Sequence, residues 1–191
     1  MIERKMIMGM PITIEIVDEV ESGVFEEAWN YFHYVDEKFS TYKDTSEISR
    51  INRGEISEQA YSEDMREIFR LSAETKLLTY GYFDIYSPRK GIIDPSGLVK
   101  GWSIKKVADI LKKRGINNFY VEAGGDIQVG GKNKDGKMWS VGIRDPRGPE
   151  KSIIKVVYLD DMGIATSGSY LRGQHIYNPF EPGENMVDIV S

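Results

Sequence analysis

The chain has 191 residues, of which 40% are hydrophobic and 29% charged, and its formal net charge is −5. This length and composition suit one domain, or two small ones, with a real hydrophobic core. The acidic balance argues against a nucleic-acid binder, which needs a basic face. Because the chain has no cysteine, disulfides, zinc thiolates and iron–sulfur clusters are excluded.

The N-terminal segment gives no sign of membrane targeting. Its first ten residues include basic side chains but no apolar run of the length that a signal peptide needs. No stretch of the chain approaches the ~20 apolar residues of a membrane span. We therefore expect no direct membrane span and a cytoplasmic location, or an extracytoplasmic one if residues ahead of Met1 have been removed.

The first half of the chain is expected to hold one strand and two long helices. Residues 7–17 are expected to form a half-buried strand, because their apolar and polar side chains alternate after Pro11. Residues 24–39 place aromatic and aliphatic side chains at helical spacing, and residues 62–80 do the same after a serine that can cap a helix. A polar segment connects these helices, with a short helical turn expected to open at Ser46.

Residues 92–103 have the composition of a ligand-binding loop. Two isoleucines end a strand there, and a helical pattern follows from Ser103 to Arg114. Between them lie a carboxylate, two glycines and Lys100. Unpaired N–H groups at a helix start, the helix dipole and a lysine together favour an anion. An ordinary strand-to-helix connection is the alternative interpretation, and neither common glycine-rich phosphate motif is matched.

The second half of the chain is expected to be mainly short strands joined by tight turns. The expected strands cover residues 118–121, 127–129, 139–143 and 152–159, and residues 187–190 alternate like the start of another. Residues 132–137 form a hairpin tip of Asp-Gly type.

Seven short motifs follow one another in order along the chain. Each is weak alone, since a Gly-Gly-Asp is usually a turn and a single histidine is more often structural than catalytic. The motifs are Phe39-Ser-Thr-Tyr42 with Ser46-Glu-Ile-Ser-Arg-Ile-Asn52, Tyr82-Phe-Asp84, Asp94-Pro-Ser-Gly-Leu-Val-Lys-Gly-Trp102, Gly124-Gly-Asp126, Trp139-Ser-Val-Gly-Ile-Arg-Asp-Pro146, Ala165-Thr-Ser-Gly-Ser-Tyr170 and His175-Ile-Tyr-Asn-Pro179. As an ordered set, they closely resemble the ApbE-like FAD:protein FMN transferases, from about Met8 to the C-terminus.

The resemblance implies a fold and an activity. The fold is α+β, a mixed, mostly antiparallel sheet with flanking helices, in a single flavin transferase domain over residues 1–191. The chain is expected to be an enzyme that cleaves FAD with Mg²⁺ and transfers the FMN half to a threonine hydroxyl of a target flavoprotein, with release of AMP. The target is expected to be a protein such as a subunit of a membrane redox complex. Two alternatives stay open, an FAD pyrophosphatase that gives FMN and AMP, and a non-catalytic FAD-binding protein.

The resemblance also assigns roles to residues of this sequence. Lys100 and His175 are expected to be catalytic, and the carbonyl of Gly97 is expected to be a metal ligand. The expected FAD-binding residues are Met8, Tyr42, Tyr82, Phe83, Asp84, Asp94, Lys100, His175 and Ile176. The residue types suit this chemistry, because methionine and aromatic faces can hold flat rings and a lysine can neutralise charge on phosphate oxygens. Without the resemblance, Met8 is interpreted as core and Tyr42 as part of a solvated loop.

Two features depart from the family pattern. The family continues past the final Val-Ser strand into a strand and a helix, which carry an acid and a threonine that resemble side-chain Mg²⁺ ligands, whereas this sequence ends at Ser191. We therefore expect a domain truncated at its C-terminus, a naturally short form, or one that a partner completes. The usual His-Ile-x-Asp-Pro has Asn178 in place of its acid, which keeps a turn hydrogen bond without a charge.

Overall fold

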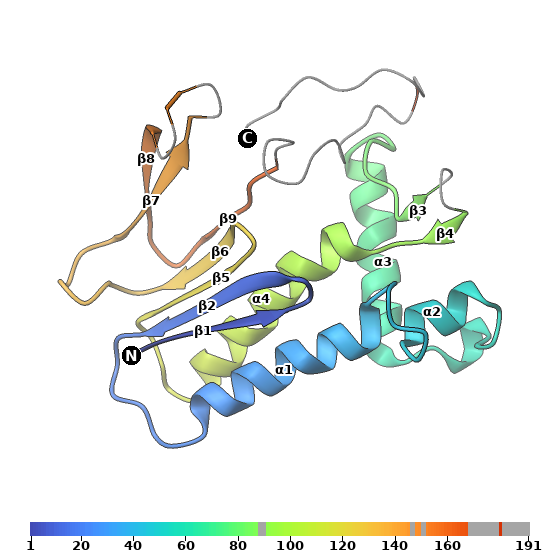
Figure 1. Ribbon diagram of the computed structural model, residues 1–191, viewed down its shortest axis with the longest axis horizontal. Coiled ribbons are helices and arrows are strands. Elements are labelled where there is room, and N and C mark those ends of the chain that lie inside the picture. The colour runs from blue at the N-terminus through green and yellow to red at the C-terminus, as the bar shows by residue number, and fades with distance from the viewer. Residues whose placement is uncertain (88–90, 146–147, 150–151, 168–179, 181–191) are drawn as a thin grey trace. The chain divides into compact units, whose positions relative to one another are not determined.

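The computed structural model describes residues 1–87, 91–145, 148–149, 152–167 and 180 (Figure 1). The chain divides into two compact units, of which the first is Met1–Ala28 with Ile104–Ser191 and the second is Trp29–Ser103. Two helices, α1 (Val24–Phe39) and α4 (Ser96–Lys113), contribute residues to both units. Each unit has buried hydrophobic residues of its own.

The first unit is built on a five-stranded sheet in the order β1-β2-β5-β6-β9, and its pairings are antiparallel. The strands are β1 (Ile2–Ile7), β2 (Met10–Ile16), β5 (Phe119–Ala123), β6 (Asp126–Gly130) and β9 (Gly163–Ile164). The predicted alternation on β2 is confirmed, because Ile12, Ile14 and Ile16 are fully buried. Branched side chains of this kind pack well on a pleated surface, so β2 anchors the core of the sheet.

Strand β1 was not predicted, because its sequence does not alternate and only its last residue, Ile7, is buried. It pairs with β2 through a two-residue turn at Met8 and Gly9, whose φ angles are 54° and 68°. Positive φ at both central residues is the conformation of a type I′ hairpin turn. Such a φ is uncommon for a residue other than glycine, so the hairpin holds Met8 in an unusual backbone conformation at one end of the sheet.

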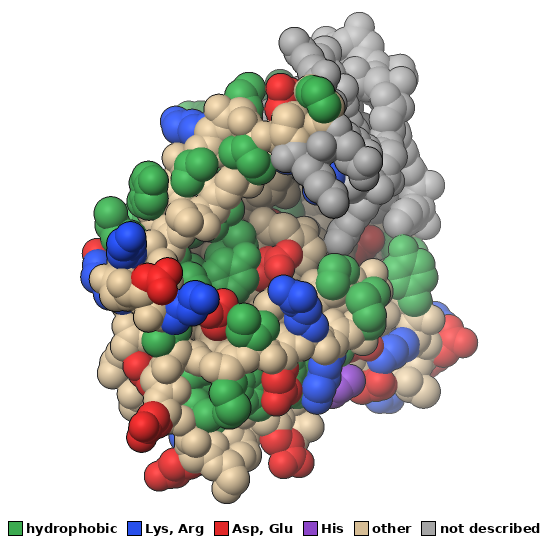
Figure 2. Space-filling view, turned by 60° about the vertical axis from the view of Figure 1, so that its left-hand side comes forward, with side chains coloured by type: hydrophobic (Ala, Val, Ile, Leu, Met, Phe, Trp, Pro, Cys, Tyr) green, Lys and Arg blue, Asp and Glu red, His purple; other side chains and the backbone are tan. Residues whose placement is uncertain are grey.

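A two-stranded ribbon, β7 (Trp139–Arg144) and β8 (Ile153–Leu159), completes the first unit. Trp139 and Leu159 form a buried cluster with Ile127 and Val129 of β6. Other apolar side chains of β8 are exposed, namely Ile153, Ile154, Val156 and Tyr158. Figure 2 shows hydrophobic side chains at several places on the surface of the molecule. An exposed apolar strand of this kind is prone to self-association.

The second unit is mainly helical. It holds the later part of α1, then α2 (Glu47–Asn52), the 3₁₀ turn η1 (Glu58–Ala60), α3 (Glu63–Leu78), the short strand pair β3 (Tyr86–Ser87) and β4 (Ile92–Ile93), and the first part of α4. Helix α1 has the predicted bounds. The hydroxyl of Ser62 accepts a hydrogen bond from the N–H of Met65 and caps α3, as predicted.

Helix α4 begins at Ser96, so the prediction of a loop as far as Ser103 is wrong. The carbonyl of Pro95 accepts a hydrogen bond from the N–H of Val99 at 3.0 Å and opens the helix. Gly97 and Gly101 lie inside its first two turns. Glycine in a helix interior costs about 1 kcal/mol relative to alanine. The start of the helix was therefore not predicted from the sequence.

The combination of helices with antiparallel sheet confirms the predicted α+β class. The prediction of one transferase domain over residues 1–191 stays a prediction. Among the helices of the described ranges, none combines the length and the apolar character that crossing a bilayer requires.

Candidate functional site

Asp94 lies at the centre of a hydrogen-bonded junction in the second unit. Its N–H donates to the carbonyl of Ile85 at 2.7 Å, and its Oδ1 accepts from the N–H of Ser96 at 3.1 Å. Asn52, the last residue of α2, exchanges two bonds with the neighbouring Ile93. Its Nδ2 donates to the carbonyl at 2.9 Å, and its Oδ1 accepts from the N–H at 2.8 Å. These bonds fix the backbone before and after Asp94 and hold its carboxylate at the start of α4.

The start of α4 carries both signs of charge. The N–H of Ser96 is one of the donors at the true start of the helix, and the carboxylate of Asp94 accepts from it. Lys100 lies one turn further along the helix and is half-buried, and its carbonyl accepts from the hydroxyl of Ser103 at 2.7 Å. A helix start with a carboxylate and an ammonium suits a ligand that carries both hydroxyl donors and phosphate acceptors.

The residues that precede β3 contact two helices, Phe83 at α4 and Asp84 at α3. The ring of Phe83 is so close to Gly97 that a Cβ at Gly97 would stand 3.3 Å from its Cε2. Oδ2 of Asp84 is 2.6 Å from Nζ of Lys76, and its Oδ1 accepts from the N–H of Tyr86 at 2.9 Å. Burial alone would raise the pKa of the Asp84 carboxyl, but these two bonds outweigh it and hold the pKa below its ordinary value. Asp84 is therefore ionised at neutral pH.

Two of the predicted flavin contacts are exposed tyrosines. Tyr42 is 92% exposed on the loop before α2, and Tyr82 is 58% exposed. The hydroxyls of Ser46 and Ser49 both donate to the carbonyl of Ser40, at 2.7 and 3.3 Å, and so order the loop that carries Tyr42. Both rings therefore offer a face on which a flat ring can stack.

The remaining predicted FAD contacts lie in the first unit or outside the described residues. Met8 belongs to the first unit, where it is half-buried in the β1–β2 turn. His175 and Ile176 lie outside the described residues. Within the second unit, the structure thus brings together Phe83, Asp94 and Gly97, with Lys100 on the same helix.

The described residues do not fit a complete magnesium site. Across the described ranges, no group of three or more His, Asp or Glu side chains lies close enough to hold a metal ion. Gly97 is in the first turn of α4, where helical geometry directs its carbonyl toward the N–H of residue 101. Mg²⁺ takes six oxygen ligands in near-octahedral geometry, so one such carbonyl falls short of a site.

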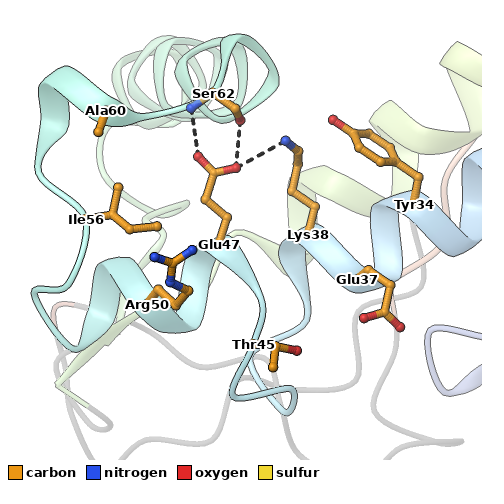
Figure 3. Close-up of a pocket in the computed structure, with 9 residues that line it drawn as sticks. All are labelled: Tyr34, Glu37, Lys38, Thr45, Glu47, Arg50, Ile56, Ala60 and Ser62. Atoms are coloured by element: carbon orange, nitrogen blue, oxygen red, sulfur yellow. Dashed lines mark hydrogen bonds and ion pairs between the residues drawn. The ribbon is translucent and has the colours of Figure 1, made fainter.

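A hollow of about 390 Å³ opens among α1, α2 and the start of α3 in the second unit (Figure 3). Glu47 projects toward its centre and accepts from the N–H and the hydroxyl of Ser62, at 2.8 and 2.7 Å. Nζ of Lys38 lies 3.2 Å from the same carboxylate. Because protein groups engage both oxygens of Glu47, we interpret this hollow as a structural junction between helices.

Comparison with known proteins identifies the family. The model of the ApbE family matches residues 8–89 and 86–184. The chain belongs to the ApbE family. Two curated relatives are named FAD:protein FMN transferase. The protein of Vibrio cholerae is 38% identical over 95 residues, which cover 46% of this chain and 28% of the relative, and that of Haemophilus influenzae is 38% identical over 79 residues, which cover 41% and 23%. The matched segments thus span only about a quarter of the length of these relatives.

Solved ApbE structures share the fold of the chain. The flavin transferase ApbE from Vibrio cholerae superposes with a TM-score of 0.81 at 24% identity, over 93% of this chain and 74% of that one. The ApbE protein from Thermotoga maritima gives a TM-score of 0.74 at 20% identity, over 89% and 71%. These likenesses extend the ApbE fold over most of the chain.

Asn52 ends one of the quoted motifs, but its sequence context predicts no role for it. Its two bonds to Ile93 make it the residue that ties α2 to the strand before Asp94. A polar residue at the end of a helix is usually interpreted as a cap. Asn52 is not a cap of this kind, because its partner Ile93 lies 41 residues further along the chain and is brought close only by the fold.

Proposed function

We propose that the chain transfers FMN from FAD to the hydroxyl of a threonine in a target flavoprotein, with release of AMP. Membership of the ApbE family and the names of the curated relatives support FAD as the substrate. The observation on this chain that carries the proposal is the junction at Asp94, which holds a carboxylate at the start of the helix that bears Lys100. The target is proposed to be a protein such as a subunit of a membrane redox complex.

The proposed step is a phosphoryl transfer. The threonine oxygen bonds to the phosphorus on the FMN side, the bond from that phosphorus to the bridging oxygen breaks, and AMP leaves with that oxygen. The hydroxyl proton passes to a base or to solvent. Such a reaction depends on positioning and on neutralising charge, rather than on covalent help from the protein. Lys100 is proposed to neutralise charge on the phosphate oxygens, while Tyr42, Tyr82 and Phe83 hold the flat rings.

Three further assignments rest on the family resemblance. His175 is proposed as the second catalytic residue, and Ile176 and Met8 as contacts of FAD. We also propose that the reaction needs Mg²⁺, which when bound would draw charge from the pyrophosphate. Because the described residues supply no complete ligand shell, no step is assigned to the ion.

The deciding experiment follows AMP release from FAD by chromatography, with Mg²⁺ or EDTA, and with or without a peptide that carries a threonine among small residues. We expect AMP only when peptide and Mg²⁺ are both present, together with a peptide whose mass has gained the FMN group. AMP without peptide would instead identify a pyrophosphatase. Flavin binding without AMP release would identify a binding protein. The absence of both flavin binding and AMP release would contradict the whole proposal.

Two lysines of α4 provide the matched variants for this assay. Lys100→Ala is expected to lower the rate of AMP release by at least about tenfold, the scale of losing one charged contact to the transition state. Lys105→Ala removes an equal charge that pairs with Asp109 on the exposed side of the helix and should leave the rate unchanged. Equal rates in both variants would show that the phosphates are not held at the start of α4.

A further inference from the structure

Three segments of the first unit meet at one end of its five-stranded sheet. The pairing of Ile12 with Ala123 places the β5–β6 turn at the same end as the β1–β2 turn. The pairing of Ile127 with Ile164 directs the chain that leaves β9 toward that end as well. Two of the quoted motifs, Gly124-Gly-Asp126 and the described part of Ala165-Thr-Ser-Gly, therefore lie beside the turn that carries Met8, and the proposed function gave neither of them a role.

Consecutive residues of the Gly-Gly-Asp motif link these segments by hydrogen bonds. The N–H of Gly124 donates to the carbonyl of Pro11 at 3.2 Å, two residues after the β1–β2 turn. The carbonyl of Gly125 accepts from the hydroxyl of Thr166 at 3.3 Å. The carboxylate of Asp126 accepts from the N–H of the same threonine at 3.1 Å. The motif thus fixes the start of β2 on one side and the segment after β9 on the other.

Asp126 differs from its neighbours in burial. It is 8% exposed, whereas Thr166 is half-buried and Ser167 is exposed. A hydrogen bond to a buried carboxylate is among the stronger ones, because the charged acceptor loses little to competing water. The buried acid therefore fixes a segment whose next residue presents a hydroxyl to solvent.

We propose that Asp126 is a positioning residue for FAD. It holds Thr166 and Ser167 beside the Gly124-Gly125 turn, so that this end of the sheet presents hydroxyl and backbone polar groups next to Met8. The polar part of the dinucleotide is the ligand that such groups recognise. This inference rests on the proposed function, in which Met8 contacts FAD.

The chain offers a matched control in Asp18, at the opposite end of the same sheet. Its carboxylate accepts from the N–H groups of Asn117 and Asn118, at 2.6 and 2.9 Å, just before β5. Burial alone would raise the pKa of Asp18, but the bonds from Asn118 and Asn117 hold it below its ordinary value. Each of the two acids thus holds a neighbouring backbone segment by hydrogen bonds, and Asp126 is the one that lies at the Met8 end of the sheet.

The test compares FAD affinity by quenching of flavin fluorescence, KM and kcat for AMP release, and Tm. Asp126→Ala is expected to raise both the Kd and the KM for FAD about tenfold, with kcat little changed, as loss of one positioning bond implies. Asp126→Asn keeps an oxygen acceptor and should stay within about threefold of the wild type in Kd. Asp18→Ala should lower the Tm as Asp126→Ala does, and leave Kd and KM unchanged.

A fourth variant covers the case in which Asp126→Ala does not fold. Thr166→Val removes only the hydroxyl bond to Gly125 and is expected to raise the Kd by about threefold, since that bond is long. If the wild type releases AMP and Asp126→Ala has an unchanged Kd, the inference is overturned and the proposed function stands. If Asp126→Ala does not fold, an unchanged Kd in Thr166→Val has the same meaning. An equal loss in Asp126→Asn and Asp126→Ala would overturn it too. A wild type that neither binds FAD nor releases AMP would overturn the proposed function and this inference together.

Discussion

The carboxylate of Glu47 in the second unit has protein partners at both of its oxygens. Its side chain is 14% exposed and contacts both donors of Ser62 and the ammonium of Lys38. Burial alone would raise its pKa, but the bonds from Ser62 and Lys38 outweigh this and hold the pKa below the ordinary value of 4.5. A carboxyl whose pKa is lower in the folded state stabilises the fold above the unfolded pKa and loses that contribution as pH falls through the folded pKa.

We therefore predict that Glu47→Gln lowers the free energy of unfolding by about 1–3 kcal/mol at pH 7, the cost of breaking charged hydrogen bonds in a partly buried place. The amide nitrogen of glutamine would face a donor whichever way it turned. The difference from the wild type should shrink as pH falls below 4.5, because the unfolded wild type then takes up a proton at Glu47, and it should be lost once the folded carboxyl is protonated as well. Urea titrations at several pH values measure it.

Glu55→Gln is the control for this prediction. Glu55 pairs with Arg53 and Arg50 but is 46% exposed, so its replacement should leave stability nearly unchanged. A loss of stability in Glu47→Gln that did not vary with pH would mean that the carboxylate charge is not what stabilises this junction.

At the level of elements, helix α4 contains two glycines whose surroundings differ. A Cβ at Gly101 would have no heavy atom within 4 Å, whereas at Gly97 it would press on the ring of Phe83 at 3.3 Å. We predict that Gly101→Ala raises the free energy of unfolding by about 1 kcal/mol through helix propensity alone. Gly97→Ala should gain less, because the Phe83 ring must shift by a few tenths of an ångström. Urea denaturation of the two variants, side by side, makes the comparison.

Equal stabilisation by the two substitutions would mean that Phe83 is not packed against α4. Since Phe83 is a proposed ring contact, a loosely held Phe83 would also remove support for the flavin site at this helix. The two alanine variants thus test an element and a part of the site together.

The elements that could be predicted from the sequence are those whose side chains alternate or repeat strongly. The fully buried Ile12, Ile14 and Ile16 gave strand β2 a clear pattern, and the aromatic stripe gave α1 its bounds. The start of α4 could not be predicted, because Gly97 and Gly101 disfavour a helix that tertiary packing nevertheless imposes. Strand β1 was missed because its side chains are mostly exposed and do not alternate.

Part of the candidate site was accessible from the sequence in the same way. The motifs singled out Asp94 and Lys100 as candidate site residues, and the structure places one just before α4 and the other in its second turn, while their chemical roles stay predictions. The bonds of Asn52 to Ile93 and of Asp126 to Thr166 were not predictable, because each joins a side chain to a backbone group about 40 residues away. No local pattern encodes such a pairing, since the fold alone brings its partners together.

For the whole molecule, binding of FAD should appear as stabilisation against heat. A ligand that binds only the folded state at about 100 times its Kd adds about 2.7 kcal/mol, which for a chain of this size raises the Tm by roughly 5–10 °C. The chain and FAD are both anionic, so the average field of the protein does not attract the dinucleotide. Its affinity must therefore come from local contacts, such as the one proposed at Lys100.

FMN and AMP, each a half of the dinucleotide, should shift the Tm by much less at the same concentration. When the two halves are linked, binding of the second half becomes an intramolecular event, so FAD binds more tightly than either half. NAD⁺ is the control, since it shares the adenylate half and the pyrophosphate but lacks the flavin ring. We expect a smaller shift with NAD⁺ than with FAD, measured by differential scanning fluorimetry with an extrinsic dye read away from flavin emission. An equal shift with NAD⁺ and FAD would show that the protein holds a dinucleotide without recognising its flavin, which the aromatic faces of Tyr42 and Tyr82 are proposed to do.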